Sequence, residues 1–105
     1  MLICIYCVDN PAVSKRIRGE RLQEHLAYLE RHRDIILLGG ARLAEDGQTR
    51  LGSTLILSVE SLRQAVEFSE QEPFRKAGLY ERVDVQRMRR AQWRPEIAPQ
   101  TPDGN

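Results

Sequence analysis

The chain has 105 residues, of which 41% are hydrophobic and 30% are charged, and its formal net charge is +1. This length suits one compact domain, because two independent cores would each be too small. A net charge so close to zero excludes a strong overall electrostatic field that would attract nucleic acid or a membrane surface. No run approaches the roughly 20 apolar residues of a membrane helix, and the apolar N-terminus lacks the basic lead of a signal peptide. We therefore expect a cytoplasmic protein that binds neither nucleic acid nor membrane.

The first third of the chain predicts a strand followed by a helix. Residues 2–8 are apolar on both faces, which is typical of a central strand, and the turn residues 9–11 end it. Ser14 is expected to cap a helix over residues 14–33. Gly19 weakens the first turns, so we expect the well-formed part of the helix to begin after it. The apolar stripe expected to be buried comprises Ile17, Leu22, Leu26 and Leu29.

A hairpin pattern follows the helix. Residues 35–38 form a short apolar run that predicts a second strand, and residues 51–59 predict a third. Asp46-Gly47 is typical of the tip of the hairpin that joins them. The side chains expected on one face of the third strand are Leu55, Leu57 and Val59.

The second helix has clear start and stop signals. Ser61 is a cap residue, and Gln64 three positions later can reach back to its backbone N–H in a capping box. The helix is expected to end at Glu72, because the residue before a proline is pushed out of helical geometry. A further turn of helix is expected over residues 74–77.

The last strand is expected to begin around Val83 and to reach Met88. Residues 94–105 contain three prolines and little to bury, so they predict a C-terminal tail after a single domain over residues 1–93.

The element order β-α-β-β-α-β predicts an α+β, ferredoxin-like fold, with a four-stranded antiparallel sheet and two helices on one face. The other face of the sheet would then expose apolar side chains, which is a liability in water. A second copy of the chain is the simplest cover, so we expect a homodimer that packs through the open sheet faces.

Cys4 and Cys7 have the C-x-x-C spacing of a redox pair or of half a metal site. Residues three apart on a strand point to opposite faces, and no second Cys/His pair completes a zinc set. We expect two unlinked strand cysteines, and neither a metal nor an organic cofactor.

His25 is the leading candidate for chemistry, because imidazole is suited to proton transfer near neutral pH. It adjoins the apolar stripe of the first helix. Glu72 lies at the proline turn, and its carboxylate could contact His25 across the domain. Such a contact would select the tautomer of His25 and stabilise its charged form. The alternative is a boundary histidine bonded to a backbone carbonyl. His32 lies in a polar helix end, which favours a structural role.

Five motifs, taken in order, resemble the YciI-like (YCII-related) family over roughly residues 1 to 93. They are the strand Ile3-Cys4-Ile5-Tyr6-Cys7-Val8-Asp9, then His25-Leu26-Ala27-Tyr28-Leu29, Gly39-Gly40, Gly52-Ser53-Thr54, and Glu72-Pro73-Phe74 followed by Ala77-Gly78-Leu79-Tyr80. The resemblance implies a dimeric ferredoxin-like α/β barrel with a histidine–aspartate dyad. Most members have no assigned reaction, one relative of similar fold is a dehydrochlorinase, and muconolactone isomerases share the wider architecture.

By position, the resemblance makes His25 the histidine of the dyad and Ser53 the serine at the strand start. The chain departs from the family pattern at two places. Glu72 occupies the aspartate position, and one methylene moves its oxygens by roughly an ångström, to which catalytic geometry is sensitive. The arginine usual three residues before the histidine is Leu22 here, with Arg21 one place earlier.

Two functions therefore remain open. One is a small lyase or isomerase, in which His25, Glu72 and Ser53 carry general acid–base chemistry on a small polar or aromatic molecule. The other is a non-catalytic small-molecule-binding or accessory protein on the same dimeric scaffold; a weaker third option is an interaction module that uses the tail. The residues expected to bind the substrate are Arg18, Arg21, Tyr6 and Phe74.

Overall fold

A computed structural model of the chain describes residues 1–104, which form an α+β fold with one sheet. The elements are β1 (Leu2–Asp9), α1 (Ser14–Arg31), β2 (Ile36–Leu43), β3 (Arg50–Ser58), α2 (Leu62–Gln71), α3 (Pro73–Lys76), β4 (Tyr80–Met88) and a short 3-10 helix at Pro95–Ile97. None of the helices within residues 1–104 is long and apolar enough to cross a membrane.

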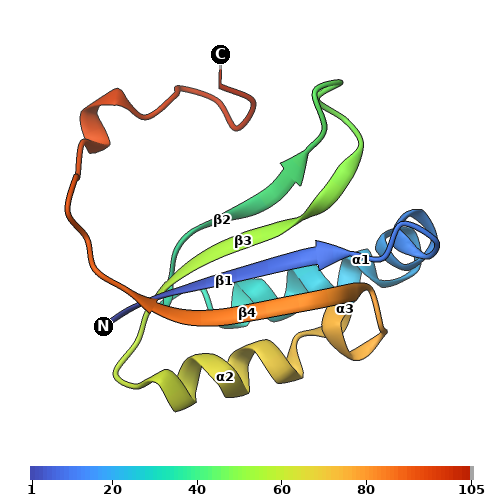
Figure 1. The fold of residues 1–105 in the computed structure, drawn as a ribbon, viewed down its shortest axis with the longest axis horizontal. Helices are drawn as coiled ribbons and strands as arrows, with labels where there is room; N and C mark the ends of the chain where they lie inside the picture. Colours follow the sequence, from blue (N-terminus) through green and yellow to red (C-terminus); the bar gives the residue numbers. More distant parts are fainter. Residues whose placement is uncertain (105) are drawn as a thin grey trace.

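The four strands form an antiparallel sheet in the order β2-β3-β1-β4, with β1 in the interior. Figure 1 shows the helices on one face of this sheet and the other face uncovered. The α+β class and the four-stranded antiparallel sheet are confirmed, and the strand order agrees with the ferredoxin-like arrangement. The helical layer contains α3 in addition to the two long helices, because the turn after Pro73 is a separate helix.

The alternation of β1 decides which side chains enter the core. Ile3, Ile5, Cys7 and Asp9 face the helices and are buried, whereas Tyr6 on the other face is 40% exposed. The core around them is completed by side chains from β3 and α2. Burial of this apolar surface, at about 25 cal/mol per Å², is the main favourable term in folding. A second cluster, Ile17, Phe74 and Leu79, lies beneath the start of α1.

The start of α1 differs from the sequence prediction. Ser14 is the first helical residue rather than the cap, and Val13 at the cap position makes no capping side-chain bond. The Ser14 hydroxyl instead donates to Asp9 Oδ2 at 2.7 Å. This bond and the buried Ile17 anchor the first turns to the sheet, so Gly19 does not delay the helix.

The predicted apolar stripe of α1 is only partly buried. Ile17 and Tyr28 are the buried residues of the helix, whereas Leu22 and Leu26 are 42% and 48% exposed. The reason is tertiary: α1 packs mainly against α3 and leaves open space towards β2 and β3. Helical periodicity marks the inward face but cannot show how closely the next layer approaches.

The hairpin agrees with its turn signals, although β2 is longer than expected. Gly39 and Gly40 continue the strand, because they pair with Leu55 and Thr54 of β3. A Cβ at Gly39 would meet the end of the Leu55 side chain. At the tip, Gly47 has φ 71°, and Asp46 accepts bonds from the backbone N–H groups of Gln48 and Thr49. A bond from the Thr49 hydroxyl, together with these two, lowers the pKa of Asp46.

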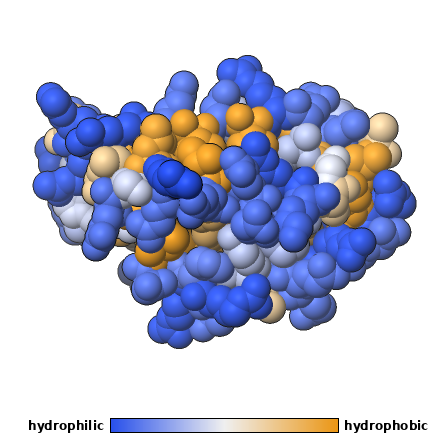
Figure 2. All heavy atoms as spheres, turned by 90° about the horizontal axis from the view of Figure 1, so that it is seen from below, coloured by the Kyte–Doolittle hydropathy of each residue, from blue (hydrophilic) through white to orange (hydrophobic). Residues whose placement is uncertain are grey.

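The signals at both ends of α2 are confirmed. The Ser61 hydroxyl accepts a bond from the Gln64 N–H at 3.1 Å, and the helix ends at Gln71. Gln64 reaches back to the N–H of Glu60 rather than that of Ser61. Figure 2, which views the molecule from the side of α2, shows mostly hydrophilic side chains with apolar patches between them.

The C-terminal segment leaves the sheet after Met88. Figure 1 shows it running away from β4 towards the side of β2. Residues 89–104 are exposed, including Trp93 and Ile97. The boundary at residue 93 and the separate tail stay predictions.

The open sheet face leads to a prediction on assembly. Leu38, paired with Ile56 on that face, is 68% exposed, so we expect two copies to cover it. Sedimentation velocity should give twice the 12.1 kDa of the chain. Leu38→Glu should shift the protein to monomer, whereas Leu62→Glu, at the start of α2 in the helical layer, should not. A monomeric parent protein would contradict the prediction.

Candidate active site

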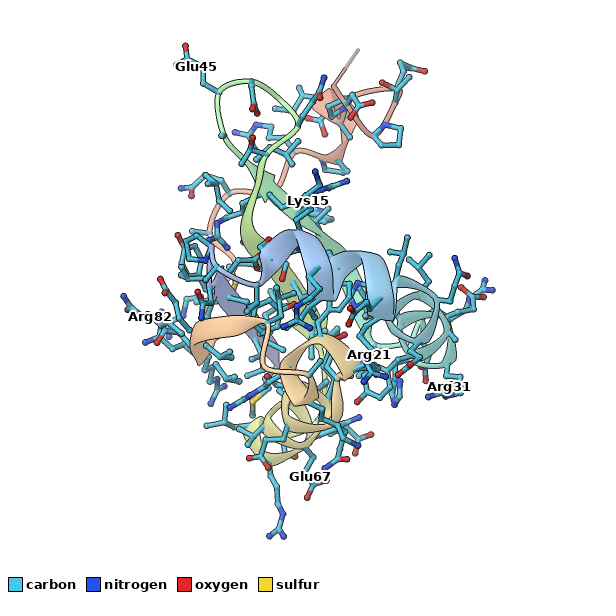
Figure 3. The ribbon with its side chains drawn as sticks, turned by 90° about the vertical axis from the view of Figure 1, so that its right-hand side faces the viewer. Lys15, Arg21, Arg31, Glu45, Glu67 and Arg82 are labelled. Carbon is cyan, nitrogen blue, oxygen red and sulfur yellow. The ribbon has the colours of Figure 1, made fainter. Side chains whose placement is uncertain are left out.

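A large hollow lies between α1 and the β2–β3 half of the sheet. The side chains of α1 form one wall, the sheet forms the floor, and residues around α3 and the start of β4 complete it. Figure 3 shows Lys15, from the start of α1, on the side of the helix that faces the hairpin tip at Glu45. The lining residues used below are Cys7, Arg18, His25, Ser53, Glu72 and Tyr80.

The structure brings His25 and Glu72 together, although they are 47 residues apart in the sequence. His25 Nδ1 lies 2.5 Å from Glu72 Oε1, and the two side chains are 16% and 6% exposed. A carboxylate accepts a hydrogen bond, so it selects the tautomer with the proton on Nδ1. Nε2 is then left with its lone pair, and it has no hydrogen-bond partner within residues 1–104.

The carboxylate of Glu72 is held by the local backbone. Glu72 follows the last residue of α2 and is the N-cap of α3, with the extended dihedrals φ −66° and ψ 129°. Its Oε2 accepts a bond from the Arg75 N–H at 3.2 Å, while Oε1 meets His25. A glutamate at this cap therefore spans both partners, and the longer side chain still reaches the histidine.

Phe74 fixes the plane of the imidazole. The two rings stack with centroids 3.9 Å apart and an interplanar angle of 13°. Phe74 is among the residues that line the hollow, but it is only 1% exposed and packs against His25. Its substrate-binding role stays a prediction.

Arg18 also lies at the hollow, but its charge is compensated. Its Nε and Nη2 donate to the two oxygens of Asp9 at 2.7 and 3.0 Å, and its guanidinium lies 5.3 Å from the Phe74 ring centroid. Asp9 is 3% exposed and also accepts the Ser14 bond. This two-point pair gives the guanidinium a defined orientation. Nη1 of Arg18 has no partner within the part of the chain described.

Ser53 belongs to a small network on the floor of the hollow. Its hydroxyl lies 3.0 Å from the hydroxyl of Tyr80, and Cys7 is its cross-strand partner. Burial raises the pKa of Cys7 to about 11. Burial, and then the nearby Glu72 carboxylate, raise the pKa of Tyr80 as well. Both groups therefore keep their protons at neutral pH.

Two of the residues predicted to bind substrate lie apart from His25. Tyr6 borders the hollow but belongs to the opposite face of the sheet, where the Arg42 guanidinium lies 3.8 Å from its ring centroid. Arg21 is exposed, pairs with Glu24 and borders a different, smaller hollow. Figure 3 shows Arg21 on the side of α1 next to α3, away from the hairpin. Arg21 lies one turn before His25 on α1, but its side chain is turned towards Glu24 and the smaller hollow.

Three residues of the site were not predicted. Asp9, Cys7 and Tyr80 all appear in the quoted motifs, but their positions in those motifs predict no role in the site. An aspartate on the inward face of an apolar strand is the one signal available, because a buried carboxylate requires a partner. Within residues 1–104, no group of three or more His, Cys, Asp or Glu side chains is placed to hold a metal.

The comparisons with known proteins agree with this fold. The model of the YCII-related domain matches residues 1–89, so the chain belongs to the YCII-related family. Among solved structures, it is similar to the 5-chloro-2-hydroxyhydroquinone dehydrochlorinase TftG from Burkholderia phenoliruptrix AC1100, in complex with 2,5-dihydroxybenzoquinone. The two chains are 36% identical with a TM-score of 0.78, over 87% of this chain and 96% of that one. No curated protein matches the chain.

The Asp9–Arg18 pair leads to a prediction on stability. Asp9→Leu should lower the free energy of unfolding by about 3 kcal/mol or more, because it leaves the largely buried guanidinium of Arg18 without a counter-charge. The double variant Asp9→Leu/Arg18→Met should lose less than the single variant, since no charge is left unpaired. Urea denaturation would measure both, and equal or greater loss in the double variant would contradict the prediction.

Burial of Cys7 predicts a loss of stability in alkali. Its pKa is higher in the folded chain, about 11 against 9.0, so its contribution is complete below pH 9 and is lost as pH rises towards 11. The loss amounts to about 3 kcal/mol at most. Chemical denaturation between pH 8 and pH 11 should show a flatter decline for Cys7→Ala than for the parent. Parallel declines would refute it.

Proposed function

We propose that the chain is a small enzyme that carries out an elimination on a small polar or aromatic molecule, with His25 as the general base. Isomerisation of such a molecule uses the same proton-transfer step and is the related alternative. The reaction class rests on the site described above and on the likeness to TftG, which is named a dehydrochlorinase.

The observation that carries the proposal is the pair of His25 and Glu72 at the hollow. Nε2 is unprotonated in the neutral tautomer, so it can accept a proton from an acidic O–H or C–H of a substrate. The imidazolium that results is stabilised by Glu72, which is already in contact with Nδ1. Stacking on Phe74 keeps the ring in place through this change of charge.

The elimination balances without another reactant. The substrate proton moves to His25 Nε2, the electron pair it leaves forms a new double bond, and the leaving group departs with its own electron pair. The imidazolium then returns its proton to solvent. The free Nη1 of Arg18 points to a role in holding an anionic oxygen of the substrate, as expected from the sequence.

Turnover should depend on both members of the pair. With 5-chloro-2-hydroxyhydroquinone as the probe, chloride release should fall at least about 100-fold in His25→Gln and in Glu72→Gln, because a positioned base contributes 10²–10⁴-fold. His32→Gln is the matched control, because His32 is the C-cap of α1, bonds Tyr28 O at 2.8 Å and does not line the hollow.

The same experiment separates the enzyme from a binding protein. Equilibrium titration with 2,5-dihydroxybenzoquinone would measure binding in the parent and in His25→Gln. Binding without turnover in the parent protein would favour the non-catalytic alternative for this class of ligand. Turnover that survives in His25→Gln would reject the proposed base.

A further inference from the structure

The hollow extends well beyond the groups that carry the proposed chemistry. Its volume is about 1520 Å³, whereas most small-molecule sites have roughly 300–1,000 Å³. A single hydroxylated ring bound at His25 would fill only the part of the hollow that holds the polar groups. The rest, between α1 and the hairpin of β2 and β3, has room for a further part of the ligand.

Two leucines of α1 form the wall of this further part. Leu22 and Leu26 line the hollow and are 42% and 48% exposed. At 3.6 residues per turn, they lie along one side of the stripe that carries Arg18 and His25. A ligand whose acidic group meets His25 Nε2 therefore has these two leucines beside it.

The sheet opposite the leucines carries little side chain. The positions of β2 that share the helix-facing side with Leu55 and Ser53 are Gly39 and Ala41, and both line the hollow. The end of the Leu55 side chain lies over Gly39. The floor is therefore low and apolar, and the side chains of residues 1–104 leave the space between the two layers open.

The charges at the far end of this wall are compensated. Glu30 and Arg33 also line the hollow, but they pair with each other at 3.0 Å, and their side chains are 71% and 77% exposed. They form a solvated rim. The wall of α1 between His25 and this rim is apolar and consists of Leu26 and Leu29.

This apolar surface is continuous with the candidate site. Leu51, which shares a face of β3 with Ser53 and Leu55, is a third leucine that lines the hollow, and it is 47% exposed. Exposed apolar side chains gathered in one cavity beside polar groups are typical of a ligand site. The pairing of copies predicted above uses the opposite face of the sheet, so it does not cover these leucines.

We propose that the substrate is amphiphilic, with an acidic oxygen-bearing head at His25 and an apolar substituent, an alkyl chain or a second ring, against Leu22 and Leu26. This rests on the proposed function and deepens it, because it names the class of molecule on which the pair of His25 and Glu72 acts. The leucines touch no reacting atom. They select the substrate by burying its apolar part.

The test compares the binding of three probes by isothermal titration calorimetry: 2,5-dihydroxybenzoquinone, its 3-hexyl derivative and its 3-(5-carboxypentyl) derivative. The hexyl compound should bind about 30-fold more tightly than the unsubstituted quinone, because a buried methylene improves affinity by up to about fourfold. The carboxypentyl compound should gain no more than about threefold, because its charge would have to leave water. The hexyl chain should also make the heat-capacity change of binding more negative.

The double variant Leu22→Gln/Leu26→Gln assigns the gain to the two leucines. Glutamine keeps the size and the helix propensity of leucine but adds a polar end. The ratio of the hexyl to the unsubstituted affinity should fall about tenfold, because two apolar contacts are lost. Leu62→Gln is the matched control, since Leu62 is 44% exposed at the start of α2 and lines neither hollow.

The outcomes separate this inference from the proposed function. Chloride release that needs His25, in a protein with equal affinity for the hexyl and unsubstituted quinones, overturns the apolar subsite and leaves the enzyme intact. A hexyl gain that falls in the double variant but not in Leu62→Gln supports the subsite, even in a protein without turnover. A hexyl gain that survives in the double variant, or a carboxypentyl compound that binds as tightly as the hexyl compound, overturns it. A folded protein that binds none of the three probes overturns it as well.

Discussion

The candidate site depends on one buried carboxylate that is shared between two partners. Glu72 is the C-cap of α2 and the N-cap of α3, and its side chain contacts His25, so one residue joins the two helices and orients the imidazole. A buried charge without such bonds would be costly. The extended backbone before Pro73 allows this arrangement, because it turns the side chain back towards the first turn of α3. Local geometry at a proline thus sets the geometry of a pair that is distant in sequence.

The hollow exists because α1 is tied to the sheet at its start and to α3 along its length, and not to the hairpin. Asp9 binds Ser14 and Arg18, which fixes the first turns of the helix over the end of β1. Further along, Leu22 and Leu26 are left facing open space. These exposed leucines line the hollow with apolar surface beside the polar groups, a mixture typical of small-molecule sites.

The groups around the hollow divide into two kinds. His25 and Arg18 each pair with a buried carboxylate. Glu72 orients the imidazole of His25, which can change its charge, and Asp9 orients the guanidinium cation of Arg18. Cys7, Ser53 and Tyr80 lie together on the floor of the hollow, and burial raises the pKa of both Cys7 and Tyr80, so they are neutral at neutral pH. A base on one wall, beside neutral polar groups on the floor, suits a reaction that begins with proton withdrawal from a small polar molecule.

The sequence by itself determined the strands, the two long helices, the proline turn and the pairing candidates His25 and Glu72, because hydrophobic period and turn chemistry are local properties. Tertiary structure alone decided which of these residues meet. Strand alternation placed Tyr6 on the other face of the sheet, the Arg21 side chain pairs with Glu24 instead of reaching the hollow, and a bulge turned Tyr80 inward. Such outcomes depend on register and on the distance between layers, which arise only when elements far apart in the chain pack together.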